Sequence, residues 1–202
     1  MNFLSHAYLS FGYEELIVGN FIADKVKGKK YLDYPTKIQK GILLHRQIDY
    51  FTDKHPLVFK MTQLISRNHG HYAPIINDIF MDHFLAKNWH DYHNQDLSTF
   101  VSKVLCILEK YKTYIPETLQ NFIIYVQKTN RLVEYQYLNS IQKTLFEVAH
   151  KIVNYPPLER AMDDLQLHYV ELEQLFKEFF VQIIAFCKLW ISQNFLNLLT
   201  EN

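Results

Sequence analysis

Residues 41–53 carry a histidine and two acids at helical spacing. Ile42, His45 and Asp49 are separated by three and four positions, so they share one face of an amphipathic helix and are expected to point inward. Asp53 follows one turn later, about 40° further around the helix axis. A buried carboxylate destabilises a protein by several kcal/mol unless it is paired or bound to a metal. We therefore expect a divalent cation or a buried basic side chain beside these acids.

Two other predicted helices also carry polar side chains on faces that are otherwise apolar. They are Asn20 and Asp24 on residues 13–27, and Asp78, Asp82 and His83 on the helix that starts at Pro74. Asp82 lies on the apolar stripe of its helix, and Asn20 and Asp24 are one turn apart. Carboxylates together with imidazole suit Mn²⁺, Mg²⁺ or Fe²⁺. The sequence thus indicates a metal site with Asp24, His45, Asp49 and Asp82 as ligands, and with His6 and His83 as further imidazoles.

Each of these features also has a purely structural interpretation. His45 and Asp49 form a hydrogen-bonded pair within one helix in that interpretation, and Asp82 with His83 is ordinary polarity of a helix surface. Asp53 is then the cap of the next helix. The metal site is favoured because three separate helices each bring inward-facing acids.

The composition favours a helical protein. The 202 residues are 49% hydrophobic and include only 5 Gly and 6 Pro, which is typical of long helices and not of a turn-rich β architecture. We expect a single irregular all-α domain over residues 1–202, with roughly seven to nine helices. The metal-site residues lie mostly in residues 1–90, and a long helical region covers residues 157–199. Besides a short first helix with His6, helices are expected over residues 13–27, from near Pro35 to 53, over 57–68, from Pro74, and over 97–111, 117–128, 132–152 and 158–199, the last as one helix or a pair.

The net charge and the two cysteines give information on the binding partners and the cellular compartment of the protein. The formal net charge is zero, which argues against a general nucleic-acid-binding protein. Cys106 and Cys187 lack metal-type spacing and lie in apolar helical segments, so we expect two buried free thiols and a reducing cytoplasm. We expect neither a signal peptide nor a membrane span, because the most apolar segment, residues 179–191, is interrupted by Gln182 and Lys188. The apolar segment 179–199 makes a homodimer plausible.

Five segments together resemble the acyl carrier protein phosphodiesterase family. They are MNFLSHAYLS, GNFIADKVKG, GILLHRQIDYFTD, YAPIINDIFMDHFLAKNW and LHYVELE. Their order and spacing are more specific than any one of them, and the similarity runs from end to end. The family is regarded as a divergent branch of the HD-domain metallophosphohydrolase superfamily. The resemblance implies an HD-like helical fold and metal-dependent removal of 4′-phosphopantetheine from holo acyl carrier protein, which leaves the apo protein.

The resemblance also implies roles for individual residues. Asp24, His45, Asp49 and Asp82 would hold Mn²⁺, with Mg²⁺, Fe²⁺ or Co²⁺ as alternatives. His83 or His6 would protonate the departing serine oxygen. Arg46 would neutralise phosphoryl oxygens or form a salt bridge to a neighbouring acid. The side chains that would orient the ligands are Asn20, Asp53 and Asp78.

A cluster of lysines suggests how the carrier protein would dock. Lys25, Lys27, Lys29 and Lys30 lie directly beside Asp24 in the sequence. Acyl carrier protein is small and strongly acidic, so these lysines would steer it to the site. A solvated loop is the plain alternative.

Two other functions remain open at this stage. One is an HD-like phosphohydrolase of a nucleotide or an alarmone, against which stands the lack of a nucleotide motif. The other is a non-catalytic helical binding protein whose inward acids are neutralised by Arg46, Arg67 or lysines.

Overall fold

The computed structural model describes residues 2–152 and 156–199, and all regular elements in those residues are helices. The α-helices are α1 (Phe3–Tyr8), α2 (Glu14–Ile22), α3 (Thr36–Lys54), α4 (Pro56–His69), α5 (Ala73–Lys87), α6 (Leu97–Lys110), α7 (Glu117–Thr129), α8 (Arg131–Glu134), α9 (Leu138–Ala149), α10 (Ala161–Leu167) and α11 (Tyr169–Asn194). Short 3₁₀ helices connect them: η1 (Ala23–Lys25), η2 (Gly28–Asp33), η3 (Gly70–Tyr72), η4 (Trp89–Asp91), η5 (Lys112–Tyr114), η6 (Leu158–Arg160) and η7 (Leu196–Leu199). The all-α prediction is confirmed, with more and shorter helices than expected.

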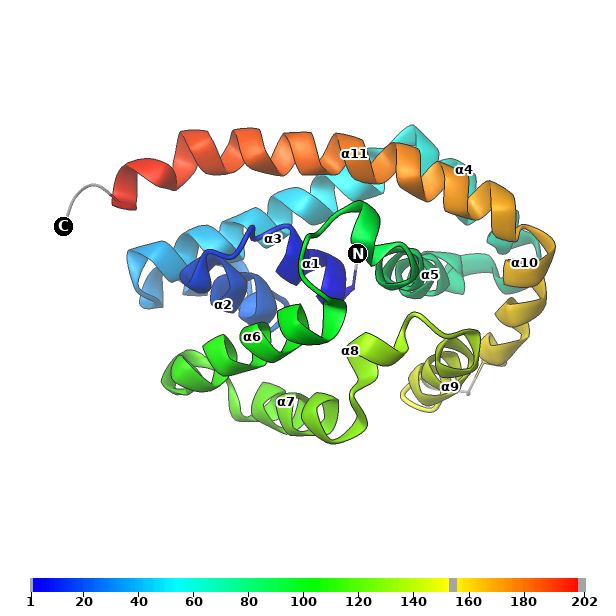
Figure 1. Ribbon diagram of the computed structural model, residues 1–202, viewed down its shortest axis with the longest axis horizontal. Coiled ribbons are helices and arrows are strands. Elements are labelled where there is room, and N and C mark those ends of the chain that lie inside the picture. Colours follow the sequence, from blue (N-terminus) through cyan, green and yellow to red (C-terminus); the bar gives the residue numbers. More distant parts are fainter. Residues whose placement is uncertain (1, 153–155, 200–202) are drawn as a thin grey trace.

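The helices surround the short helix α1. Figure 1 shows α11 along one edge of the molecule, with α6 and α7 on the opposite side and α1 between them. Helix α11 packs against α3 and α4, and α1 packs against α2 and α5. The central position of α1 brings its histidine close to side chains from several other helices.

Two glycines allow α2 and α3 to touch backbone to backbone. A Cβ atom on Gly19 would lie 2.2 Å from the carbonyl oxygen of Ile38, and one on Gly41 would lie 2.7 Å from that of Leu16. Both distances are shorter than real Cβ contacts, so any side chain at these positions would push the helices apart. The close contact sets residue 20, the neighbour of Gly19, opposite residue 45, one turn beyond Gly41.

Gly41→Ala is therefore expected to lower the free energy of unfolding by about 1–3 kcal/mol. The obstructing atoms belong to the backbone of α2 and cannot rotate away as a flexible side chain would. Urea unfolding measures the effect. Gln47→Ala on the exposed face of the same helix is the control and should change stability by less than about 0.5 kcal/mol. An unchanged midpoint for Gly41→Ala would contradict the close contact.

The segment predicted as one helix over residues 132–152 is divided in two, so that prediction was wrong. Helix α8 ends at Glu134, and α9 begins at Leu138. Between them the carbonyl oxygen of Tyr135 accepts a hydrogen bond from His83 at 2.8 Å. The hydrogen bond from His83 on α5 thus takes the place of the backbone hydrogen bond that the Tyr135 carbonyl would accept in a continuous helix.

Two further predictions need correction. The helix expected over residues 13–27 ends at Ile22 and tightens into the 3₁₀ turn η1. Cys187 is buried as predicted, whereas Cys106 is exposed although it lies in an apolar segment, because it falls on the outer face of α6.

The C-terminal region forms a helix pair, one of the two arrangements expected. Helices α10 and α11 meet at His168. The inner face of α11 buries Phe179 and Phe180 within the monomer. Among the described helices, none is long and apolar enough to cross a membrane.

Candidate metal centre

Two histidines and one acid converge between α1 and α3. The candidate ligand atoms of His6, His45 and Asp49 all lie within 4.8 Å of one another. Nε2 of His6 is 3.3 Å from one carboxylate oxygen of Asp49, and Nε2 of His45 is 3.0 Å from the other. The two imidazole rings stack with their centroids 4.1 Å apart. Both histidines are buried while 40% of the Asp49 side chain is exposed, so the cluster reaches the surface at the carboxylate.

Asp24 approaches the cluster from the solvent side. It lies on η1, and its carboxylate oxygen is 3.3 Å from Nε2 of His45. The tight turn that ends α2 early brings this acid toward α3. Three of the four predicted ligands, Asp24, His45 and Asp49, are therefore together, and His6 completes the group.

Asn20 fixes the orientation of His45. Its side-chain nitrogen donates to the carbonyl oxygen of His6 at 3.0 Å, so its oxygen must be the atom that accepts from Nδ1 of His45 at 3.0 Å. This assignment places a proton on Nδ1 and directs Nε2 toward the carboxylates. A second polar group that orients a ligating histidine is typical of metal sites, and Asn20 occupies the predicted position.

The charges of the cluster suit a cation. Burial lowers the pKa of His6 to about 4, so its imidazole is neutral. Burial also lowers the pKa of His45, but hydrogen bonds with Asp24 and Asp49 outweigh this effect and raise it to about 9. Burial alone would raise the pKa of Asp49, yet its bonds to the two histidines hold it well below its usual range. The carboxylates of Asp24 and Asp49 thus stabilise a positive charge at Nε2 of His45. A divalent cation would supply the same positive charge there, and it would have histidine and carboxylate side chains as its ligands.

Asp82 has a different partner from the one predicted. It is fully buried, and its carboxylate accepts the backbone N–H groups of Leu4 at 3.0 Å and Ser5 at 3.1 Å. The Ser5 hydroxyl donates to it as well. Burial raises the pKa of Asp82 to about 6, against the effect of these hydrogen bonds. Asp82 therefore caps the N-terminus of α1 and positions His6, and the structure does not place it with the other predicted ligands.

His83 lies in a hydrogen-bond network away from the cluster. Its Nδ1 donates to the carbonyl oxygen of Tyr135, and its Nε2 accepts from the hydroxyl of Tyr169, both at 2.8 Å. Burial lowers its pKa. Both ring nitrogens thus connect α5 to distant parts of the chain, which is not the arrangement expected for the general acid.

Arg46 shapes the turn that carries the lysines. Its guanidinium donates to the carbonyl oxygens of Val26 and Gly28, both at 2.9 Å, and lies over the ring of Tyr31. Both bonds come from one nitrogen, Nη2, and they hold the guanidinium at this turn. Arg46 does not line the cavity at the cluster, and its role as a phosphoryl partner stays a prediction.

Of the other two predicted orienting residues, Asp53 is exposed and Asp78 is half-buried. Asp53 is exposed in the last turn of α3. It does not cap α4, because the imidazole of His55 accepts the N–H of Leu57 there. Burial raises the pKa of Asp78, and the negative charges of Asp49 and Asp53 contribute to the rise. Asp78 thus lies within electrostatic reach of Asp49, and the orienting roles of Asp53 and Asp78 stay predictions.

The cluster opens into a cavity of about 260 Å³. Its lining contains the polar side chains of Asn2, His6, Asn20, Asp24, Lys25 and His45, and the apolar side chains of Phe3, Phe21, Leu119 and Phe122. The apolar part of the lining was not predicted from the sequence. Phe3 and Phe21 are close in sequence to ligand residues and give some signal, whereas the pattern of α7 is that of any amphipathic helix.

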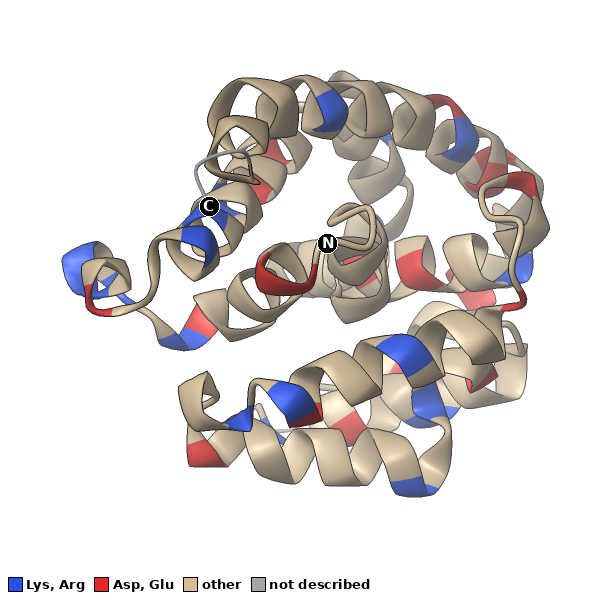
Figure 2. Cartoon of the chain, turned by 60° about the vertical axis from the view of Figure 1, so that its left-hand side comes forward, with Lys and Arg blue, Asp and Glu red and all other residues tan. Residues whose placement is uncertain are grey.

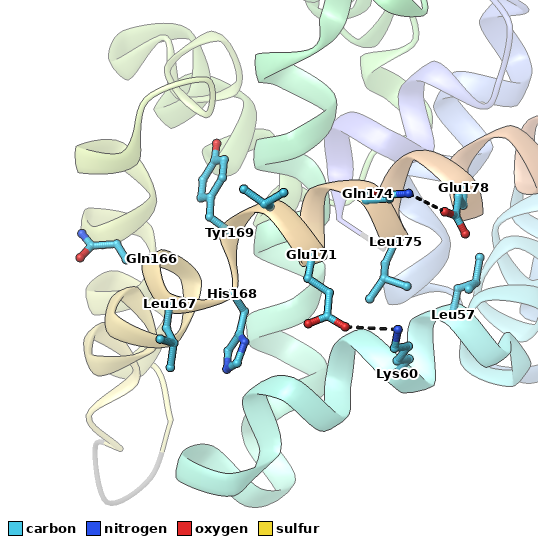
Figure 3. A pocket seen from close by; sticks show the side chains of 11 residues that line it. Leu57, Lys60, Gln166, Leu167, His168, Tyr169, Glu171, Gln174, Leu175 and Glu178 are labelled. Carbon is cyan, nitrogen blue, oxygen red and sulfur yellow. Dashed lines mark hydrogen bonds and ion pairs between the residues drawn. The ribbon is translucent and has the colours of Figure 1, made fainter.

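A larger hollow of about 650 Å³ lies between α4, α10 and α11 (Figure 3). Lys60 and Glu171 form an ion pair of 3.2 Å across it. Leu57 and Leu175 contribute apolar side chains to its lining, and His168 points downward in this view. Among the described residues, the group of possible metal ligands lies at the first cavity and not at this hollow.

The predicted docking lysines are exposed around η1 and η2. Lys25 also lines the cavity at the cluster. Elsewhere acidic and basic residues are both scattered over the helices (Figure 2). The lysines are therefore a local feature in a chain with no net charge.

Comparison with known proteins gives one consistent family. The sequence profile described as acyl carrier protein phosphodiesterase matches residues 1–183. A protein of that name from Photorhabdus laumondii is 32% identical over 181 residues, covering 89% of this chain and 91% of that protein. One from Yersinia enterocolitica is 32% identical over 186 residues, covering 92% and 96%. One from Escherichia coli O157:H7 is 30% identical over 192 residues, covering 92% and 96%. No solved structure matches the chain.

Proposed function

We propose, since the chain belongs to the acyl carrier protein phosphodiesterase family, that it hydrolyses the phosphodiester between 4′-phosphopantetheine and the serine of holo acyl carrier protein. The bond from phosphorus to the serine oxygen breaks, the water oxygen remains on phosphopantetheine, and a proton ends on the serine. The observation that carries this proposal is the convergence of His6, His45 and Asp49, of which the two histidines line a cavity.

The residues of the cluster would hold a divalent cation, for which we propose Mn²⁺, with Mg²⁺, Fe²⁺ or Co²⁺ as alternatives. Such a cation lowers the pKa of a bound water and offers positive charge to a phosphate ester. His6, His45 and Asp49 would bind it directly, and Asp24 would approach from the cavity side. The neutral state of His6 suits a ligand better than a general acid.

Other side chains of the cavity would prepare the substrate. Asn20 keeps Nε2 of His45 pointed at the carboxylates. Lys25 lines the cavity, so its ammonium group is placed to neutralise phosphoryl oxygens, the role first given to Arg46.

The proposal is tested by the intact mass of the carrier protein after incubation with this protein, with Mn²⁺ present or chelated. Metal-dependent loss of the phosphopantetheine mass is the expected result. Metal-dependent hydrolysis of nucleotides or alarmones without any change to holo carrier protein would favour the HD-like alternative. Lack of both activities, with no bound metal and unchanged stability after chelation, would favour a non-catalytic binding protein.

Charge reversal of the basic turn tests docking of the carrier protein. Replacing Lys27, Lys29 and Lys30 with Glu should lower kcat/KM for holo carrier protein by about 10-fold or more at low salt. Hydrolysis of a small phosphodiester should be unchanged, since these lysines lie outside the cavity lining. The control reverses three exposed lysines elsewhere, Lys54, Lys143 and Lys151. Equal loss on both substrates would contradict docking.

Three further predictions from the sequence are retained as proposals. The protein would act in the cytoplasm, without nucleic-acid or membrane partners. Residues 1–202 would form one domain, since the buried apolar side chains of the described helices form one cluster. A homodimer would use the outer face of α11, where Val181 and Leu189 are 62% and 58% exposed.

A further inference from the structure

The cavity at the metal-binding cluster has one wall made of apolar side chains. Phe3 and Phe21 come from α1 and α2, and Leu119 and Phe122 come from α7. We call these four side chains the apolar wall. The rings of Phe3 and Phe21 meet edge to face at 4.9 Å, and Phe122 lies 6.1 and 6.2 Å from them. These are favourable spacings for aromatic pairs, so the three rings support one another.

The apolar wall and the side chains of the candidate ligands line the same cavity. His45, Asn20 and Asp24 line the same hollow of about 260 Å³. Cavities for drug-sized ligands are typically about 300–1,000 Å³, so this hollow suits a phosphoryl group and a few neighbouring atoms. In a cavity of this size, the part of the substrate that contacts the apolar wall would be the group attached directly to the reacting phosphate.

Phosphopantetheine carries its most apolar group at this position. A methylene joins the phosphate oxygen to a carbon that bears two methyl groups, and the two amides and the thiol follow only further along the arm. The serine side of the phosphodiester offers a peptide backbone instead. An apolar wall beside the phosphate thus matches the pantoyl end of the arm in both position and chemistry.

We infer that the apolar wall binds the dimethyl-substituted carbon of the pantoyl group and so selects phosphodiesters with a branched apolar carbon next to the ester methylene. This inference rests on the proposed function. Leu119 and Phe122 are then specificity-determining residues, although α7 contributes no ligand to the cluster.

The test compares two small diesters in the presence of Mn²⁺: 4-nitrophenyl 2,2-dimethylpropyl phosphate and 4-nitrophenyl propyl phosphate. The native protein is expected to prefer the branched ester by about 10-fold in kcat/KM, because two additional methyl groups are buried. Phe122→Ala and Leu119→Ala should each bring this ratio several-fold closer to 1. Ile124→Ala is the matched control, since Ile124 lies on the same helix with 46% of its surface exposed, and it should keep the native ratio.

Folding and metal binding are checked by circular dichroism and metal content, so that a changed ratio is not the result of unfolding. Branched and unbranched alkyl phosphates are also compared as competitors of carrier hydrolysis, which decides the case if the small diesters react too slowly. A ratio that stays at the native value in both α7 variants would overturn the inference alone. Absence of any phosphodiester hydrolysis by the native protein would instead contradict the proposed function.

Discussion

His45→Gln is expected to abolish metal-dependent hydrolysis, with a loss of about three orders of magnitude in kcat/KM for holo carrier protein. His45 is the imidazole on which Asp24 and Asp49 both converge, and a bound cation contributes several kcal/mol to a phosphoryl transition state. The same variant should lose bound Mn²⁺ after dialysis, measured by elemental analysis. Glutamine keeps the approximate size of the side chain, so unfolding is not expected to dominate.

Asn20→Ala separates ligation from orientation. It leaves both histidines and both acids in place but removes the acceptor for Nδ1 of His45. Loss of such an orienting group typically weakens metal binding by about 10- to 100-fold. Excess Mn²⁺ should therefore restore most of the activity of Asn20→Ala and none of that of His45→Gln.

His90→Gln is the control for both variants, since His90 is exposed and its side chain pairs only loosely with Asp96 at 3.9 Å. It should retain native activity and metal content. Full activity of His45→Gln, with metal retained, would exclude this cluster as the catalytic metal site.

The spacing in α3 predicted much of the candidate site, because this one helix carries two of the candidate ligands, His45 and Asp49. His45 is buried on the same stripe as Ile42, and Asp49 follows where that stripe reaches the surface. Asn20 was found by the same argument and is buried. Asp24, which was expected to point inward one turn later, is exposed, because α2 ends at Ile22 and Asp24 lies on η1. Helical periodicity was sufficient to predict a candidate site residue wherever its partner lay on the helix face that the periodicity identified.

Asp82 and His83 show where this reasoning stops. The periodicity of α5 correctly indicated that Asp82 is buried, but it carries no information on which element lies opposite. That element is the N-terminus of α1, whose N–H groups from Leu4 and Ser5 donate to the carboxylate. The apolar wall could not be predicted for a related reason, because α7 has an ordinary amphipathic pattern and its exposure to the cavity depends on tertiary packing.

Asp82→Ala is expected to destabilise the protein without removing the metal. The substitution leaves the N–H groups of Leu4 and Ser5 buried without their acceptor, which should lower the free energy of unfolding by about 3 kcal/mol. The matched control is Asp96→Ala, an exposed acid that precedes α6 without a capping hydrogen bond, and it should change stability by less than about 0.5 kcal/mol. Urea unfolding and Mn²⁺ titration provide the two measurements.

The pH dependence of this loss follows from the burial of Asp82. Burial raises its pKa from 3.8 to about 6 in the folded protein, so on acidification the folded state takes up the proton before the unfolded chain does. The native protein therefore gains stability relative to Asp82→Ala as the pH falls from about 6 toward 4, and loses that gain as the pH rises through 6. The difference between the two proteins should be larger at about pH 5 than at about pH 7. If Asp82 were a ligand instead, Asp82→Ala would lose Mn²⁺ as completely as His45→Gln. That result would place the Asp82 carboxylate in the cluster and would contradict its assignment as the cap of α1, the helix that carries His6.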